Sequence, residues 1–180
     1  VAAMGGHRFV DEEGEPATAR GARAAGAILA LSTATSVPIE RVAAEAGPWW
    51  FQLYVAHDRA RCGDLVRRAA AAGAAAIVVT VDVPKLGRRE GGRRTGFALP
   101  PGVTFPHLLP DDVPEQSADA PGFYQLIEWD AAVGWDDIDW LVGLTDLPVV
   151  VKGVLHPADA REAVARGARG VIVSNHGGRQ

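Results

Sequence analysis

The residues best suited to chemistry form one cluster at residues 174–180, with the sequence Ser-Asn-His-Gly-Gly-Arg-Gln. His176 can accept a proton near neutral pH, and Arg179 can bind a carboxylate through two parallel hydrogen bonds. The two glycines between them let the backbone approach a flat ligand closely. The cluster therefore predicts a site that moves a proton beside an anionic ligand. A glycine-rich turn after a strand is the structural alternative.

Polar residues of the same kind follow other apolar runs of the chain. They are Ser32, Gln52, Tyr54, Thr80, Asp82 and Lys152. Lys152 directly follows three valines, where an ammonium group is costly unless it faces an electron-rich partner. Asp82 is suited to orient the imidazole of His176, as a carboxylate does in a catalytic triad. The neutral hydroxyl and amide side chains of the set suit the edge of a heteroaromatic ring.

Each of these positions also has an ordinary structural interpretation. Gln52 and Tyr54 point to the same side of one strand, which is equally typical of a partly polar barrel interior. Asp82 precedes a Val-Pro pair and fits the cap of a turn. Arg88 and Arg89 belong to a basic stretch of the kind that usually faces solvent. The combination of these residues, rather than any one of them, indicates a functional site.

The elements that must position these residues alternate along the chain. Apolar runs predict strands at residues 27–31, 49–55, 76–81, 148–151 and 170–173, and the end of another at residues 1–5. Helices are predicted at residues 15–25, 37–46, 59–72, 136–141 and 157–166, with Ser36, Asp58 and either Asp136 or Asp137 as caps. Such alternation predicts a parallel sheet, and the residues just past its strands meet at one end. The predicted fold class is α/β, a partial (β/α)8 TIM barrel with about six of the eight strands present.

Two stretches between the predicted strands lack this alternation. Residues 85–96 indicate a basic, glycine-rich loop, and residues 101–134 are rich in proline and acids without clear periodicity. A connection as long as the second is usually a functional lid or a mobile segment. Both ends of the chain also look cut. We therefore predict one barrel domain over residues 1–180, truncated at both ends, with residues 101–134 as an active-site lid or mobile loop.

The composition narrows the class of protein. The 180 residues are 48% apolar and 22% charged, which is typical of a globular domain. The net charge of −4 gives no reason to expect nucleic acid, and no apolar run approaches the roughly 20 residues that cross a bilayer. The single cysteine, Cys62, agrees with a reducing compartment. We expect a cytoplasmic protein that binds neither nucleic acid nor membrane, has no metal site, and forms a homo-oligomer when full length.

The ordered motifs of the chain resemble one family, the FMN-dependent 2-hydroxy acid oxidases and dehydrogenases, which include glycolate oxidase, lactate oxidase and mandelate dehydrogenase. The matching stretches are residues 14–15, 31–32, 50–54, 80–90, 97–100, 135–141, 148–153 and 174–180. They stand in the family's order and cover nearly the whole chain outside residues 101–134. The last stretch is highly specific to the family.

This resemblance implies a role for each matching residue. His176 would be the general base, paired with Asp82, and Tyr54 would hydrogen-bond the substrate. Arg179 and Arg89 would hold its carboxylate. The flavin ring would be held by Ser32, Gln52, Thr80 and Lys152, with Ala3, Met4 and Gly5 corresponding to the stretch that lies against it. A fixed cation such as Lys152 near the ring stabilises the negative charge that reduction places there.

The predicted function is therefore FMN-dependent oxidation of an (S)-2-hydroxy acid to a 2-oxo acid, with oxygen or another acceptor taking the electrons. The particular hydroxy acid, the acceptor, and the choice between hydride and carbanion chemistry are left open by the sequence. Two alternatives also stay open. One is another FMN-binding barrel enzyme, such as a type 2 isopentenyl diphosphate isomerase. The other is an inactive fragment that lacks the strands of the phosphate-binding site.

Overall fold

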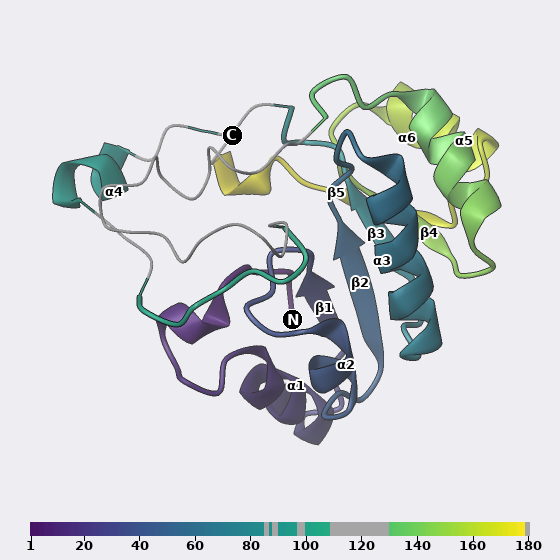
Figure 1. Cartoon of the computed structure of the whole chain (residues 1–180). Coiled ribbons are helices and arrows are strands. Elements are labelled where there is room, and N and C mark those ends of the chain that lie inside the picture. Colours follow the sequence, from purple (N-terminus) through teal and green to yellow (C-terminus); the bar gives the residue numbers. More distant parts are fainter. Residues whose placement is uncertain (85–86, 88–89, 97–99, 109–129, 179–180) are drawn as a thin grey trace.

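A computed structural model describes residues 1–84, 87, 90–96, 100–108 and 130–178 of the chain (Figure 1). The strands are β1 (Leu29–Ser32), β2 (Trp49–Leu53), β3 (Ile77–Thr80), β4 (Val149–Val154) and β5 (Gly170–Val173). The helices are α1 (Glu15–Ala24), α2 (Ile39–Ala43), α3 (Arg59–Ala71), α4 (Glu90–Thr95), α5 (Trp135–Leu144) and α6 (Pro157–Ala165). Single 3-10 turns lie at His7–Phe9 and His176–Gly178.

The five strands form one parallel sheet in chain order, β1-β2-β3-β4-β5. Each neighbouring pair is connected through a helix or a longer crossover, as parallel strands require. The carboxyl ends of all strands therefore meet at one edge of the sheet, where the 3-10 turn at His176–Gly178 also lies (Figure 1). This confirms the α/β class and the incomplete barrel that the sequence predicts.

The prediction of a further strand at residues 1–5 is wrong. Only Val1 bonds to the edge of β1, where its ammonium group donates to the carbonyl of Ile28 at 2.6 Å and its carbonyl accepts from the N–H of Ala30 at 2.9 Å. The next backbone bond of this segment to the sheet region is from Gly6 to Ala34, past the end of the strand. A single residue bonded to β1 does not form a strand, so the described sheet has five strands rather than six.

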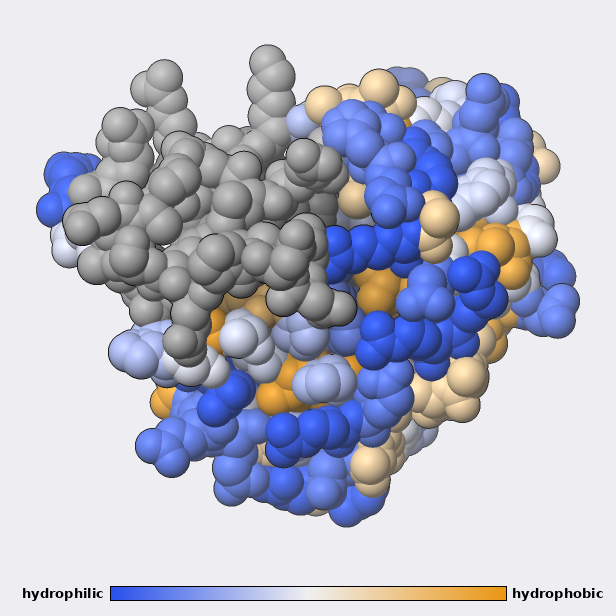
Figure 2. All heavy atoms as spheres, in the orientation of Figure 1, coloured by the Kyte–Doolittle hydropathy of each residue, from blue (hydrophilic) through white to orange (hydrophobic). Residues whose placement is uncertain are grey.

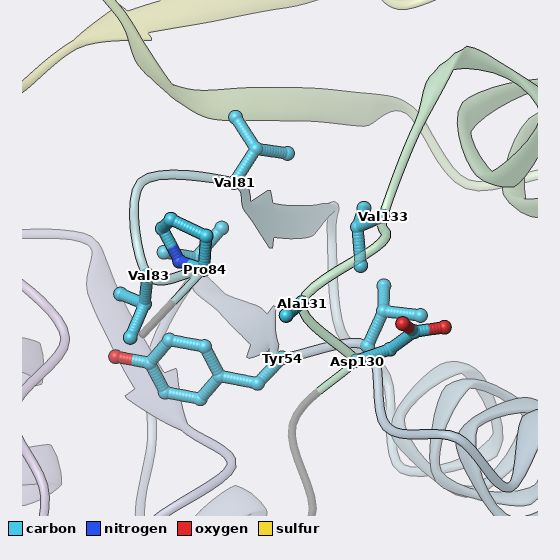
Figure 3. A pocket seen from close by; sticks show the side chains of 9 residues that line it. Tyr54, Val81, Val83, Pro84, Asp130, Ala131 and Val133 are labelled. Atoms are coloured by element: carbon cyan, nitrogen blue, oxygen red, sulfur yellow. The ribbon is translucent and has the colours of Figure 1, made fainter. Parts of the chain in front are cut away.

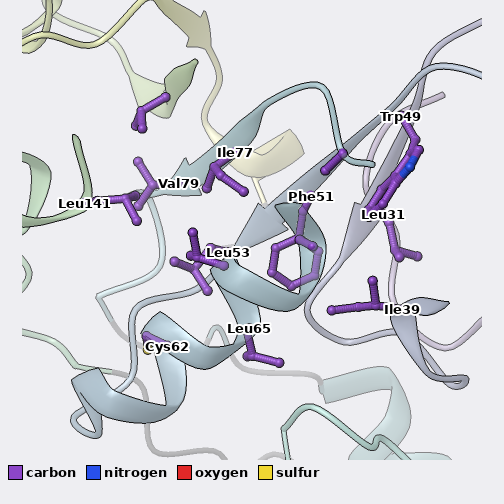
Figure 4. Close-up of a cluster of buried hydrophobic side chains, with 14 of the residues drawn as sticks. Leu31, Ile39, Trp49, Phe51, Leu53, Cys62, Leu65, Ile77, Val79 and Leu141 are labelled. Carbon is purple, nitrogen blue, oxygen red and sulfur yellow. The ribbon is translucent and has the colours of Figure 1, made fainter. Parts of the chain in front are cut away.

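The side chains of each strand alternate between two faces, and this alternation separates the core from the site. Leu29, Leu31, Phe51, Leu53, Ile77, Val79, Val149 and Val151 are buried against the helices. Figure 4 shows Cys62 and Leu65 of α3 beneath the strands that carry Phe51 and Leu53. The intervening residues face the opposite side, which is the inside of the partial barrel. Ser32, Gln52, Thr80 and Lys152 are the last such residues of their strands.

The helix starts agree only partly with the predicted caps. Asp58 caps α3 as predicted, because its carboxylate accepts from the N–H of Arg61 at 3.0 Å. Ser36 does not cap α2, since its hydroxyl donates to the buried carboxylate of Glu15 at 2.6 Å instead. Helix α5 starts after Gly134, whose N–H donates to Asp137 at 2.9 Å. Helix α4 lies within the stretch for which the glycines indicated a loop.

The surface is mainly hydrophilic on the face shown in Figure 2, with small apolar areas between the polar side chains. Among the residues that the structure describes, no helix is long and apolar enough to cross a membrane.

Candidate active site

Neutral polar side chains cross the inner face of the sheet at the carboxyl ends of its first three strands. The hydroxyl of Ser32 donates to Oε1 of Gln52 at 3.0 Å, and Nε2 of Gln52 donates to Oγ1 of Thr80 at 3.0 Å. All three residues are at most 5% exposed. Ser32 pairs with Gln52 and Thr80 pairs with Lys152 in the parallel register, whereas Gln52 pairs with Val78, so its bond to Thr80 runs diagonally between β2 and β3. The structure thus brings Ser32, Gln52 and Thr80 into hydrogen-bond contact with one another.

A charged cluster continues this row of polar side chains and consists of Lys152 on β4, Asp82 after β3 and His176 after β5. Oδ1 of Asp82 lies 2.8 Å from Nδ1 of His176, and its Oδ2 lies 3.3 Å from Nζ of Lys152. Nζ of Lys152 is also 3.4 Å from Nδ1 of His176. The shorter, charge-assisted contact decides the tautomer, so Nδ1 carries a hydrogen that it donates to Asp82. Nε2 of His176 is then the nitrogen that can accept a proton.

The backbone after β5 holds His176 in an unusual conformation. Its φ angle is +58°, in the left-handed region that residues other than glycine rarely adopt. The hydroxyl of Ser174 accepts from the N–H of His176 at 3.0 Å and donates to Oδ2 of Asp82 at 3.3 Å. One serine therefore connects the backbone of His176 to the carboxylate that its imidazole also contacts. Such strain often marks a functional position.

Gly153 makes the close approach of Asp82 to β4 possible. The pairing of β4 with β5 shifts register between Lys152 and Val154, and Gly153 lies in this bulge with a φ of +111°. A Cβ at Gly153 would stand 2.6 Å from Cβ of Asp82 and 2.7 Å from its nitrogen. Only glycine fits this space and this backbone angle. Gly153 falls within the matching stretch 148–153, but the sequence pattern assigned a role only to its neighbour Lys152, although a glycine inside a strand is a signal of a bulge.

Tyr54 approaches the same histidine from the end of β2. Its hydroxyl lies 3.5 Å from Nε2 of His176, the nitrogen opposite the one that contacts Asp82. Tyr54 also lines a small cavity of about 30 Å³, room for about one water molecule. The other lining residues are Val55, Thr80, Val81, Val83, Pro84, Asp130, Ala131 and Val133. Figure 3 shows that Tyr54 and Pro84 bound it on one side and Ala131 and Asp130 on the other.

Arg59 holds the segment that forms the far side of this cavity. Its guanidinium lies 2.7 Å from Oδ2 of Asp130 and 2.6 Å from Oδ1 of Asp137. The N–H of Ala132 and then the guanidinium of Arg59 lower the pKa of Asp130, because both stabilise its carboxylate. The N–H of Asp130 donates to the carbonyl of Val55 at 3.1 Å. This cluster was not predicted, since its acidic residues lie more than seventy positions from the arginine.

The remaining predicted site residues divide into two groups. Ala3, Met4 and Gly5 run past the end of β1, where a Cβ on Gly5 would stand 2.8 Å from Cβ of Ala34. Met4 is 57% exposed. The predicted carboxylate clamp, Arg89 and Arg179, lies outside the described residues, as does Arg88. Its placement relative to His176 therefore stays a prediction.

A parallel sheet whose strand ends bring together a histidine–aspartate pair, a lysine and a row of neutral donors is the arrangement of a barrel enzyme. The family model of the FMN-dependent dehydrogenases matches residues 1–180, and the chain belongs to this family.

Individual relatives agree with this assignment. The chain is 45% identical to glycolate oxidase 1 of Zea mays over 100% of its own length and 50% of that protein. It is 46% identical to 4-hydroxymandelate oxidase of Amycolatopsis orientalis, covering 100% of the chain and 51% of that protein. A crystal structure of mandelate oxidase superposes with a TM-score of 0.85 at 45% identity, covering 100% of the chain and 49% of that structure. The chain thus spans about half the length of the relatives that it matches.

The described donors fit the cofactor of this family. FMN presents ring nitrogens and carbonyl oxygens along one edge of its flavin. In the bonds that the structure shows, the amide of Gln52 uses one of its two hydrogens and Lys152 directs one of three toward Asp82. The remaining hydrogens, with the hydroxyl of Thr80, form a donor-rich edge that suits those acceptors. One of the similar structures is a mandelate oxidase variant with an FMN adduct, which agrees with this fit.

Proposed function

We propose that the full-length protein oxidises an (S)-2-hydroxy acid to the 2-oxo acid, with His176 as the base. By full-length protein we mean the longest natural form that contains these residues. The substrate loses two protons and two electrons in this reaction. His176 takes one proton at Nε2. The second proton either leaves together with the electron pair as a hydride, when His176 takes the hydroxyl proton, or leaves the hydroxyl as the electron pair departs, when His176 takes the α-proton first. FMN, when bound, supplies the acceptor for that pair.

The observation that carries the proposal is the orientation of His176. Asp82 accepts the hydrogen of Nδ1 at 2.8 Å, so Nε2 is directed toward the hydroxyl of Tyr54. A substrate hydroxyl within hydrogen-bond distance of both groups would meet a proton acceptor and a hydrogen-bond partner. The carboxylate of Asp82 also stabilises the imidazolium that forms when the proton arrives. Lys152, on the other side of Asp82, would donate to the flavin edge.

The substrate class follows from the relatives, whose names specify glycolate, lactate and 4-hydroxymandelate oxidation. Arg89 and Arg179 would hold the carboxylate that these acids share. Oxygen or another acceptor would then reoxidise the cofactor. The family match favours this function over the isomerase alternative.

The test is His176→Gln in the full-length protein with FMN. The variant should retain the flavin, because the predicted ring contacts come from other residues. It should lose flavin reduction by glycolate, lactate or mandelate by about 10²- to 10⁴-fold, the usual contribution of a general base. Stopped-flow bleaching of the flavin absorbance measures this rate. His156→Gln is the matched control, since His156 is exposed and caps α6. Bleaching of the His176 variant within tenfold of wild type would exclude His176 as the base.

A further inference from the structure

Thr33 connects the carboxyl ends of β1 and β2 through its side chain. The residue is 2% exposed and follows the last residue of β1. Its hydroxyl donates to the carbonyl of Gln52 at 2.6 Å and accepts from the N–H of Tyr54 at 3.2 Å. Its own N–H donates to the same carbonyl at 2.9 Å and lies 3.3 Å from Oε1 of the Gln52 side chain. Every one of these partners belongs to the site or its backbone.

The two bonds of the Thr33 hydroxyl extend the connection between β1 and β2 beyond the last paired residues of these strands. The paired register of β1 and β2 stops at Ser32 and Gln52. Two residues beyond Gln52, the N–H of Tyr54 donates to a side-chain oxygen instead of a carbonyl of the neighbouring strand. A hydroxyl has one hydrogen to donate, and here it is directed at Gln52 while its lone pair faces Tyr54. The two bonds together restrict the direction in which the side chain of Tyr54 leaves the backbone.

We propose that Thr33 is a positioning residue, which holds the ring of Tyr54 at the distance from His176 that catalysis requires. This inference rests on the proposed function for its kinetic consequence. Thr33 touches neither substrate nor cofactor in this role and acts through Tyr54. A misplacement of about 1 Å in a catalytic group can cost up to about 100-fold in rate, so a lost anchor in the backbone of Tyr54 should be measurable.

Three variants of the full-length protein test the role of the Thr33 hydroxyl. Thr33→Val removes this hydroxyl at nearly constant volume, and Thr33→Ser retains it. Thr35→Val is the matched control, because Thr35 is 0% exposed in the same loop and its hydroxyl donates to the carbonyl of Val37 at 2.9 Å, away from the site. Flavin reduction should slow about tenfold or more in Thr33→Val. It should stay within twofold of wild type in Thr33→Ser and in Thr35→Val.

A double-mutant cycle with Tyr54→Phe separates positioning from a general loss of structure. If Thr33 acts through the tyrosine hydroxyl, Thr33→Val should cost less than twofold in the Tyr54→Phe background. An equal loss in both backgrounds would overturn the proposal. Should Thr33→Val fail to fold, Thr33→Cys keeps a small side chain with a weak donor and is put through the same cycle, with the same two outcomes.

A structural readout keeps this test independent of the reaction. In a crystal structure of Thr33→Val, the hydroxyl of Tyr54 should lie clearly farther from Nε2 of His176 than the 3.5 Å seen here. An unchanged tyrosine would contradict the positioning role even if the protein oxidises no hydroxy acid. If the wild-type protein oxidises no hydroxy acid but Tyr54 is displaced in Thr33→Val, the proposed function would be rejected. The positioning of Tyr54 by Thr33 would still be supported.

Discussion

Asp82 is the residue on which the charged part of the site depends. Its carboxylate contacts His176, Lys152 and Ser174, which come from two different strand ends. Its side chain is 9% exposed, so these three contacts supply most of the hydrogen bonds that water would otherwise donate to the carboxylate. The position of this carboxylate is set by the backbone of Gly153, against which Asp82 packs.

We therefore expect Gly153→Ala to displace Asp82 and slow flavin reduction by substrate at least about tenfold, since a shift of about 1 Å in such a group can cost more. Stopped-flow measurement of the full-length variant checks this. Gly73→Ala controls for backbone strain, because Gly73 has a φ of +87° but nothing within 4 Å of an added Cβ. Gly170→Ala controls for a methyl group in the sheet, where the nearest atom would be 3.8 Å away. A similar loss in either control would show that crowding of Asp82 is not the cause.

Helix α2 begins through a contact with a distant residue. Its N-cap, Pro38, makes no side-chain hydrogen bond, and the N–H of Ile39 donates instead to Nε2 of His107 at 3.1 Å. The acceptor nitrogen must be unprotonated, so the imidazole is neutral in the folded protein. Burial, and then the positive charge of Arg68, lower the pKa of His107 to about 4 from an ordinary value of 6.5. His107 as a whole residue is 3% exposed, in agreement with burial as the main cause.

This lowered pKa predicts a loss of stability in mild acid. Above pH 6.5 His107 is neutral in both states and has no effect on the pH dependence. Between pH 6.5 and pH 4 the unfolded chain binds a proton that the folded chain does not, so the free energy of unfolding falls by at most about 3 kcal/mol. Denaturant unfolding at a series of pH values should show this fall in wild type and a smaller one in His107→Gln. His156→Gln, at an exposed histidine, should keep the wild-type slope.

At the scale of the whole molecule, the described sheet is open rather than closed into a barrel, and β1 and β5 are its edge strands. In the part of the chain that the structure describes, β5 pairs only with β4, and Val173 is 76% exposed. Leu155, directly after β4, and Val164, on α6, are 67% and 56% exposed. An unpaired strand edge with apolar neighbours is a template for association with other chains.

We expect the 180 residues expressed alone to aggregate and to retain little FMN. Barrels frequently bind phosphate through the loops after their seventh and eighth strands, and the described sheet has five. Light scattering and a flavin absorbance scan after desalting would check both properties. A yellow, monomeric protein that oxidises a hydroxy acid would show that these residues suffice for folding and function.

The residue types at the strand ends can be predicted from the sequence alone. Apolar runs followed by a polar residue were enough to find Gln52, Thr80 and Lys152, because side chains alternate along a strand and parallel strands end together. The motif around His176 was enough to indicate the family, which the comparisons confirm.

Only the tertiary structure showed how these residues are held. The contact of Gly153 with Asp82 joins residues 71 positions apart, and the bond between His107 and Ile39 joins residues 68 apart. The hydroxyl of Thr33 accepts a hydrogen bond from the N–H of Tyr54, 21 positions away. Sequence periodicity reports on neighbours within one element, whereas these contacts depend on which elements pack together and on the shape of the space between them. Their positions could therefore be read only once the strands were in register.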